Sequence, residues 1–178
     1  MREARVIDAA KLCPSLAEFK AHIRLVGSDM DPDLTLKLRA AIMAAEGFVG
    51  QILAPSVFTR QCALALSTPL MVPVVSVTSV TVDGEPLDPS LYRVNSDGVL
   101  VIDKSVEGEQ MVVVYSAGEG DLPDDIKAAI LLHAAALFNN PVDSVETMPK
   151  ASTNLLRRYR RWELPVSAAP ITVNQEGA

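Results

Sequence analysis

The sequence has few aromatic residues, and this shortage limits what the protein can do. Of its 178 residues, 49% are hydrophobic and only 4% are aromatic, so aliphatic side chains and alanine make up the apolar content. Such a core suits close packing of helices and is poorly suited to an aromatic-lined ligand pocket. The apolar fraction excludes disorder over most of the chain, and the length fits one compact domain.

Cysteine and long hydrophobic runs are also scarce. Cys13 and Cys62 are too few for a disulfide framework and match no metal or redox spacing, which predicts two thiols in a reducing compartment. The first sixteen residues are charged throughout and show no apolar segment of a signal peptide. The longest apolar run, residues 128–138, is interrupted by His133 and is far short of the roughly 20 residues of a membrane span. We therefore expect a soluble, cytoplasmic protein with no membrane partner.

The chain is acidic overall, but its charge is unevenly divided. Sixteen basic against 22 acidic residues give a net charge of −6, which argues against a protein whose main task is to hold nucleic acid. Lys150, four arginines and Glu163 give residues 150–163 a charge of +4, which leaves −10 for the rest. The basic residues alternate with aromatic ones, and the candidate interface residues are Arg157, Arg158, Tyr159, Arg160, Arg161 and Trp162. Arginine beside Tyr and Trp is typical of protein interfaces and also of nucleic-acid contacts, and a solvated helix explains the pattern as well. We favour a protein contact.

Start and stop signals predict about four helices. Ser15 and Glu18 form a capping box for a helix over residues 15–24. Asp31 followed by Pro32 opens a helix over residues 32–53. Apolar periodicity predicts two more helices, at 123–140 and 153–162.

The middle of the chain changes to a period of two, which is typical of strands. We expect strands at 57–66, 74–82 and 110–117, and a hairpin that joins 91–94 to 99–102. Residues 57–117 thus form a small antiparallel β unit inserted between helices. The predicted fold class is α+β: a small helical bundle with a β insert, forming one domain over residues 1–163, and an extended C-terminal arm or tail at 164–178.

No motif in the chain indicates catalysis, a cofactor or a metal. The triplet Asp29, Asp31 and Asp33 lacks the Gly and Glu of a calcium loop, and Gly118-Glu-Gly120 is crowded by acids that would repel a phosphate. His133 lies on an apolar helix stripe, which predicts a hydrogen-bonded core histidine. The remaining candidates are explained by ordinary surface or helix-start roles: His22, Ser116 and the pair Asp124–Asp125. We expect no enzyme.

Alanines are concentrated in two of the predicted helices. They are Ala40, Ala41, Ala44 and Ala45 in one, and Ala128, Ala129, Ala134, Ala135 and Ala136 in the other. Small side chains let helix axes approach closely, either within one chain or between subunits. Both interpretations stay open.

Several segments, taken in order, resemble the head–tail connector, or head-completion adaptor, proteins of tailed phages and prophages. Leu16 to Leu25 resembles the family's opening "LxExKxHLRL", and Ala40 to Val49 its "AAxxxxExY", with Phe48 at the aromatic position. Pro73 to Val80 is similar to "PVxSVxSV" and Asp88 to Val94 to "LDPSxYRV". The pattern continues through the Ala-Gly and Pro-Asp-Asp-Ile-Lys segments at 115–130 to the Leu-Leu-x-x-Tyr-Arg segment at 155–160. The resemblance covers about residues 15–162, while Arg161, Trp162 and the long tail depart from it.

The resemblance implies a structural protein of the virion neck, made in the host bacterial cytoplasm. It implies a ring, usually of twelve copies, that docks beneath the portal protein, extends the DNA channel and presents a surface to the next neck or tail protein, a stopper or tail terminator. DNA would pass through the channel without specific binding, and no catalytic residues or cofactors are implied. The alternative is a small DNA-binding or regulatory module that uses the arginine-rich C-terminal helix.

Overall fold

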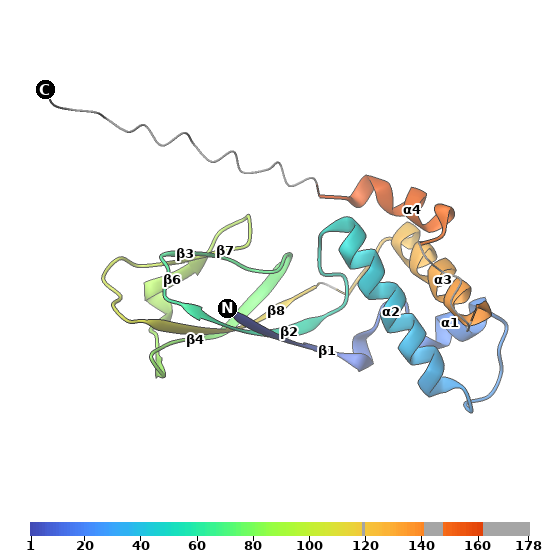
Figure 1. The fold of residues 1–178 in the computed structure, drawn as a ribbon, viewed down its shortest axis with the longest axis horizontal. Helices are drawn as coiled ribbons and strands as arrows, with labels where there is room; N and C mark the ends of the chain where they lie inside the picture. Colours follow the sequence, from blue (N-terminus) through green and yellow to red (C-terminus); the bar gives the residue numbers. More distant parts are fainter. Residues whose placement is uncertain (119, 141–147, 162–178) are drawn as a thin grey trace, which may run out of the picture.

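The computed structural model describes residues 1–118, 120–140 and 148–161. In these residues four helices and two antiparallel sheets confirm the α+β fold class. The helices gather at one end of the molecule and the sheets at the other, and α2 lies beside the end of the larger sheet (Figure 1). The elements in chain order are β1 (Arg2–Ile7), α1 (Leu16–His22), α2 (Asp31–Val49), β2 (Ser56–Ala63), β3 (Ser67–Pro69), β4 (Val74–Val82), β5 (Glu85–Pro86), β6 (Tyr92–Val94), β7 (Val99–Ile102), β8 (Gln110–Ala117), α3 (Asp124–Asn139) and α4 (Lys150–Leu156).

The helical end is held by an aliphatic core. α2 packs against α3, α3 against α4, and α1 against both α2 and α3. Buried side chains from all four helices form one cluster, which includes Phe19, Leu38, Ile42, Ile130 and Leu156. Since alanines of α2 and α3 are also buried in this cluster, part of the alanine enrichment serves packing within the chain.

The sheets enclose a second core. Five strands pair in the order β1-β2-β8-β4-β5, and three short strands pair in the order β3-β7-β6. Phe58 and Tyr115 stack between them with ring centroids 5.3 Å apart, beside the buried residues Leu100, Met111 and Val113. The expected strands at 74–82 and 110–117 and the hairpin of β6 and β7 are confirmed. The strand expected at 57–66 ends at Ala63, and residues 67–69 form β3 in the other sheet.

Strand β1 is the element that sequence analysis missed. It pairs with β2 along its whole length, but its inward-facing positions include the charged residues Glu3 and Arg5, so the usual apolar alternation is absent. Both charges have buried partners. The Glu3 carboxylate accepts hydrogen bonds from Arg60 at 2.8 Å and from the Tyr115 hydroxyl at 3.0 Å.

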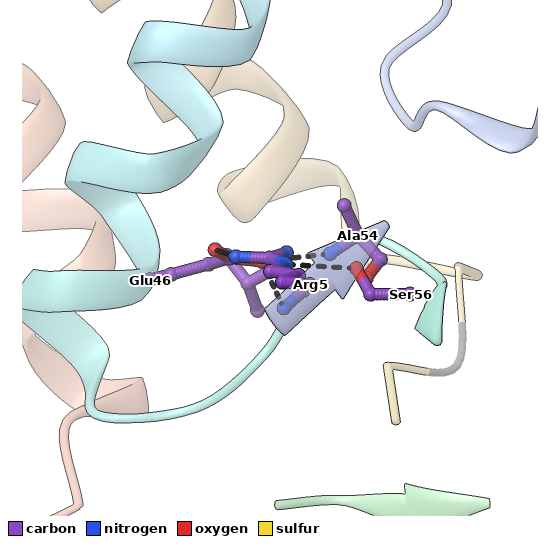
Figure 2. A network of polar contacts seen from close by, with 5 residues as sticks. Arg5, Glu46, Ala54 and Ser56 are labelled. Carbon is purple, nitrogen blue, oxygen red and sulfur yellow. Dashed lines mark hydrogen bonds and ion pairs between the residues drawn. The ribbon is translucent and has the colours of Figure 1, made fainter. Parts of the chain in front are cut away.

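A buried ion pair connects the helical end to the sheet. Arg5 of β1 donates two hydrogen bonds to the Glu46 carboxylate of α2, at 2.6 and 2.8 Å, and a third to the Ser56 hydroxyl. One Glu46 oxygen also accepts the backbone N–H groups of Leu53 and Ala54 at 2.8 and 3.0 Å. Figure 2 shows Arg5 lying between α2 and the start of β2. Glu46 therefore fixes both the position of β1 and the course of the chain from α2 to β2.

The predicted bounds of two helices were wrong. The helix expected at 32–53 ends at Val49, because Gly50 adopts the left-handed conformation with φ of 73° and caps the last turn. The helix expected at 153–162 begins at Lys150 and ends at Leu156, and residues 157–159 form a single 3₁₀ turn. No helix of the described residues is long and apolar enough to span a membrane.

Candidate interface at the arginine arm

The candidate interface residues lie at the C-terminal end of α2. We call residues Arg157–Arg161 the arginine arm; Trp162 and the tail at 164–178 lie outside the described residues. The Gln51 side chain donates to the Tyr159 carbonyl at 3.1 Å, and the Arg161 N–H donates to the Val49 carbonyl at 2.8 Å. Because these contacts use backbone groups that a longer helix would need, the arm turns away from helical geometry at Arg160. The expected arginine-rich helix is therefore an irregular segment held by α2.

Aromatic rings position two of the arginines. Arg158 lies over the Tyr159 ring at 4.8 Å and donates to its hydroxyl at 2.7 Å. Arg158 also pairs with Asp125 at the start of α3. The hydrogen bond to Tyr159 and the Asp125 charge raise the pKa of Arg158 above its ordinary value, so this guanidinium is cationic at every accessible pH. Arg160 lies over the Phe48 ring of α2 at 5.5 Å.

The arm supplies the positive charge that the end of α2 lacks. The last turn of α2 contains no basic residue, although a helix C-terminus favours nearby cations. Arg160 and Arg161 are placed beside this terminus by Phe48 and Val49. All four arginines of the arm remain exposed. The surface therefore presents several guanidinium groups in positions fixed by backbone contacts.

A small apolar groove lies next to the arm. Its volume is about 170 Å³, and it is lined by the end of α2, by residues 121–123 and by Tyr159. Two acids stand close to the arm, Asp121 in the groove wall and Asp125 on Arg158. A continuous basic face suits a nucleic-acid backbone, whereas arginines around an apolar groove suit a protein partner. The arrangement favours the protein contact.

The other sequence candidates occupy structural positions. Asp31 and Asp33 form ion pairs with Lys20 and Lys37, and in the described part of the chain no cluster of His, Cys, Asp and Glu could hold a metal ion. The Ser116 hydroxyl pairs with that of Ser76 across the sheet. His22 is exposed.

Two further candidates concern a glycine and a buried histidine. Gly118 has a φ of 88°, and a side chain there would strike the Ala54 carbonyl, so the backbone at this position requires glycine. His133 is buried, which lowers its pKa. The expectation that it is hydrogen-bonded was wrong for Nδ1, which has no partner among the described residues.

Sequence analysis missed the residues that support the arginine arm and β1. Phe48 and Glu46 were noticed only as positions of a family pattern, and the structure shows them as the support for Arg160 and for Arg5. Asp125 was interpreted as a helix-start acid, and it also binds Arg158. The "ExY" spacing within the resemblance was the one signal that could have identified Glu46 and Phe48.

The described residues thus form an α+β fold with an exposed, positively charged arm at the end of α2. The sequence model described as "Head completion protein" matches residues 14–134. The chain belongs to the head completion protein family, which is structural and not enzymatic. The earlier resemblance is thereby confirmed. A search of curated protein sequences gave no match.

Solved structures with the same fold come from gene transfer agent (GTA) particles. A chain from "Neck of empty GTA particle computed with C6 symmetry" is 23% identical, with a TM-score of 0.74, over 92% of this chain and 97% of that one. A chain from "Neck of native GTA particle computed with C12 symmetry" gives 23% and 0.73 with the same coverage. A third, from "Virion of native gene transfer agent (GTA) particle", gives 24% and 0.70, again with the same coverage. At this identity the likeness shows the common fold.

Proposed function

We propose that this protein is the connector of a phage-like particle and forms a twelve-copy ring in the neck, beneath the portal protein. The observation that carries the proposal is the match of nearly the whole chain to proteins of the GTA neck, together with membership of the head completion family. The ring extends the DNA channel from the head and offers its far side to the next neck or tail protein.

The charge of the chain supports a channel through which DNA slides. Each copy carries a net charge of −6, and multiple phosphate contacts would be needed to hold DNA in place. A net-acidic ring avoids such contacts. The positive charge is concentrated instead in the arginine arm, which faces the solvent at the end of α2.

The arginine arm, with Trp162 and the tail at 164–178, reaches the portal in this proposal. Support comes from the exposed guanidinium groups, their fixation by Val49 and Gln51, and the adjacent apolar groove. An acidic, partly apolar portal surface fits this arrangement.

The test compares two quadruple variants in portal binding. Replacing Arg157, Arg158, Arg160 and Arg161 by alanine is expected to reduce binding of the protein to portal-containing, tail-less particles by at least tenfold. The matched control removes four exposed cations elsewhere, Arg2, Arg24, Arg93 and Lys104, and is expected to bind nearly as the wild type does. Equal binding by both variants would refute the role of the arm.

A second measurement tests the neck assignment itself. Electron microscopy of particles with and without the protein is expected to show a ring under the portal only when the protein is present. Electrophoretic mobility shift at physiological salt is expected to show no tight duplex binding by the free chain. Tight binding that depends on the arginine arm would instead establish the DNA-binding alternative.

A further inference from the structure

Helix α2 presents an apolar stripe to solvent. The stripe consists of Leu36, Ala40, Met43 and Gly47, which share one helix face by their spacing and are all exposed. Leu36 and Met43 are 67% and 55% exposed, whereas the outer face of a helix is ordinarily polar. The stripe is therefore a helix face without a partner in the described part of the chain.

Gly47 strengthens this conclusion. A side chain added there would meet nothing within 4 Å, so no contact within the described residues requires glycine. Glycine inside a helix costs up to about 1 kcal/mol relative to alanine. A residue without a side chain on an exposed stripe lets the backbone of another chain approach α2 closely.

The large sheet carries a second exposed apolar surface, which we call the valine row. It runs across four strands through residues that lie opposite one another: Val6 of β1, Val57 of β2, Ser116 of β8 and Ser76 of β4. Val75 precedes Ser76 in β4. The three valines are between 46% and 69% exposed. Val57 and Val75 line one open groove of about 370 Å³ together with Ser116, and the register shift between Val74 and Ser76 places Val75 beside the Ser76–Ser116 pair, so both valines border the same exposed surface.

The valine row faces away from the contact between the sheet and α2. Side chains alternate along a strand. Arg5, the neighbour of Val6, binds Glu46 of α2, and Ser56, the neighbour of Val57, accepts a hydrogen bond from Arg5. The row is thus on the opposite face of the sheet and cannot be covered by α2 of its own chain.

The two surfaces match in length. The stripe extends over eleven residue steps from Leu36 to Gly47, which at 1.5 Å per step is about 16 Å. The valine row crosses four neighbouring strands, which at 4.7–4.9 Å per step is about 14 Å. One helix laid across the row would therefore contact it along the whole stripe.

The two surfaces also match in charge. Neither contains a charged side chain along its length, which matters between identical copies that each carry −6. Arg39 lies beside Leu36 and Met43 on α2 and is exposed, and no described residue forms an ion pair with it. The groove of the valine row has Asp8 and Lys11 in its wall. One Asp8 oxygen accepts the Ala10 N–H at 3.1 Å, and the other lies 3.4 Å from the Lys11 ammonium, which is 73% exposed.

We propose that the α2 stripe of one copy packs across the valine row of the next copy, with Arg39 placed against Asp8. The proposal rests on the ring proposed above and identifies its subunit contact. Because the two surfaces are different, the contact is heterologous and repeats from copy to copy until the ring closes.

Disulfide trapping tests the contact in assembled particles. In a background with Cys13→Ala and Cys62→Ala, the pair Met43→Cys with Val57→Cys is expected to give, on mild oxidation, a ladder of cross-linked species up to the ring size. Each single-cysteine variant is expected to give no ladder. A dimer from Met43→Cys alone would show a symmetric contact between two α2 helices and would overturn the proposal.

Surface substitutions provide an independent measurement. Met43→Glu is expected to reduce the ring fraction in native mass spectrometry, with portal present, by at least tenfold while the circular dichroism spectrum is unchanged. Val26→Glu is the matched control, since Val26 is 95% exposed and lies off the stripe. Arg39→Asp is expected to weaken the ring, and Asp8→Arg on the same chain to restore it.

The outcomes separate this inference from the function on which it rests. A wild-type ring that Met43→Glu leaves intact would overturn the subunit contact and leave the neck function standing. A Met43→Glu ring that forms but fails to bind particles would assign the stripe to the portal, which also overturns the inference. The absence of any ring for the wild type in particles would overturn both.

Discussion

Replacing Glu46 by alanine removes the group that connects the helical end of the molecule to the sheet. The Glu46 carboxylate is buried, receives two hydrogen bonds from Arg5, and accepts the backbone N–H groups of Leu53 and Ala54. Each buried N–H left without an acceptor costs about 1–3 kcal/mol. Breaking a buried ion pair by removing one partner costs about 3–5 kcal/mol in total.

Arg5 reduces the expected loss. Its side chain is 19% exposed, so it recovers part of its hydration when Glu46 is absent. We therefore expect the free energy of unfolding to fall by about 3–4 kcal/mol for Glu46→Ala. For a chain of this size the loss corresponds to roughly 10 °C in Tm. Glu46→Gln keeps one acceptor oxygen for Leu53 and Ala54 and should lose about half as much.

Urea denaturation followed by circular dichroism measures these losses. The control is Asp33→Ala, which breaks the ion pair of Asp33 with Lys37 on the surface of α2 and is expected to cost less than about 1 kcal/mol. If Glu46→Ala cost no more than the Asp33 control, the contact between Arg5 and Glu46 would not hold the two ends of the molecule together.

Three other predictions concern a turn, a histidine and a tyrosine, each checked by the midpoint of urea denaturation. Gly118→Ala is expected to destabilise the protein more than Gly27→Ala: both glycines have a positive φ, but only at Gly118 would the new side chain strike a backbone carbonyl. An equal loss for both would exclude that collision. Burial lowers the pKa of His133 below its ordinary value near 6.5. Between pH 6.5 and the lower folded-state pKa the unfolded chain therefore binds more protons than the folded one, and stability falls as pH falls. His133→Leu should make stability depend less on pH in this range, and an unchanged slope would assign the dependence to other groups. Burial raises the pKa of Tyr115 to about 12. Tyr115→Phe is expected to cost about 1–3 kcal/mol because the partly buried Met71 N–H and Glu3 carboxylate both lose their hydrogen bond to the hydroxyl; a neutral substitution would show that water replaces it.

Where local signals decide the structure, the sequence was sufficient. The capping box at Ser15 and Glu18 is present as predicted, and β4 and β8 begin and end at the predicted residues, because their alternating side chains face a buried core on one side. α3 begins directly after Pro123 with Asp124 and Asp125 in its first turn, as the proline and the acidic residues predict.

Where distant residues decide the structure, the sequence was insufficient. The strand β1 carries charges at two of its inward positions, and their partners lie 41 or more residues away. The arginine arm has helical spacing but leaves the helix, because Val49 and Gln51 bind its backbone. The sequence of residues 150–162 alone therefore could not predict the hydrogen bonds that the arm forms with Val49 and Gln51.

The segment by which the family is recognised is smaller than the unit that folds. Recognition covers residues 14–134, but β1 and α4 lie outside it, although Ile7 of β1 packs against the helical core and Leu156 of α4 is buried in it. A fragment cut at those limits would leave Glu46 buried without Arg5, expose one edge of β2, and remove Leu156 from the helical core. An open strand edge invites pairing between chains. A fragment limited to the recognised segment would therefore lack contacts that hold this chain together, even though the family is identified from that segment alone.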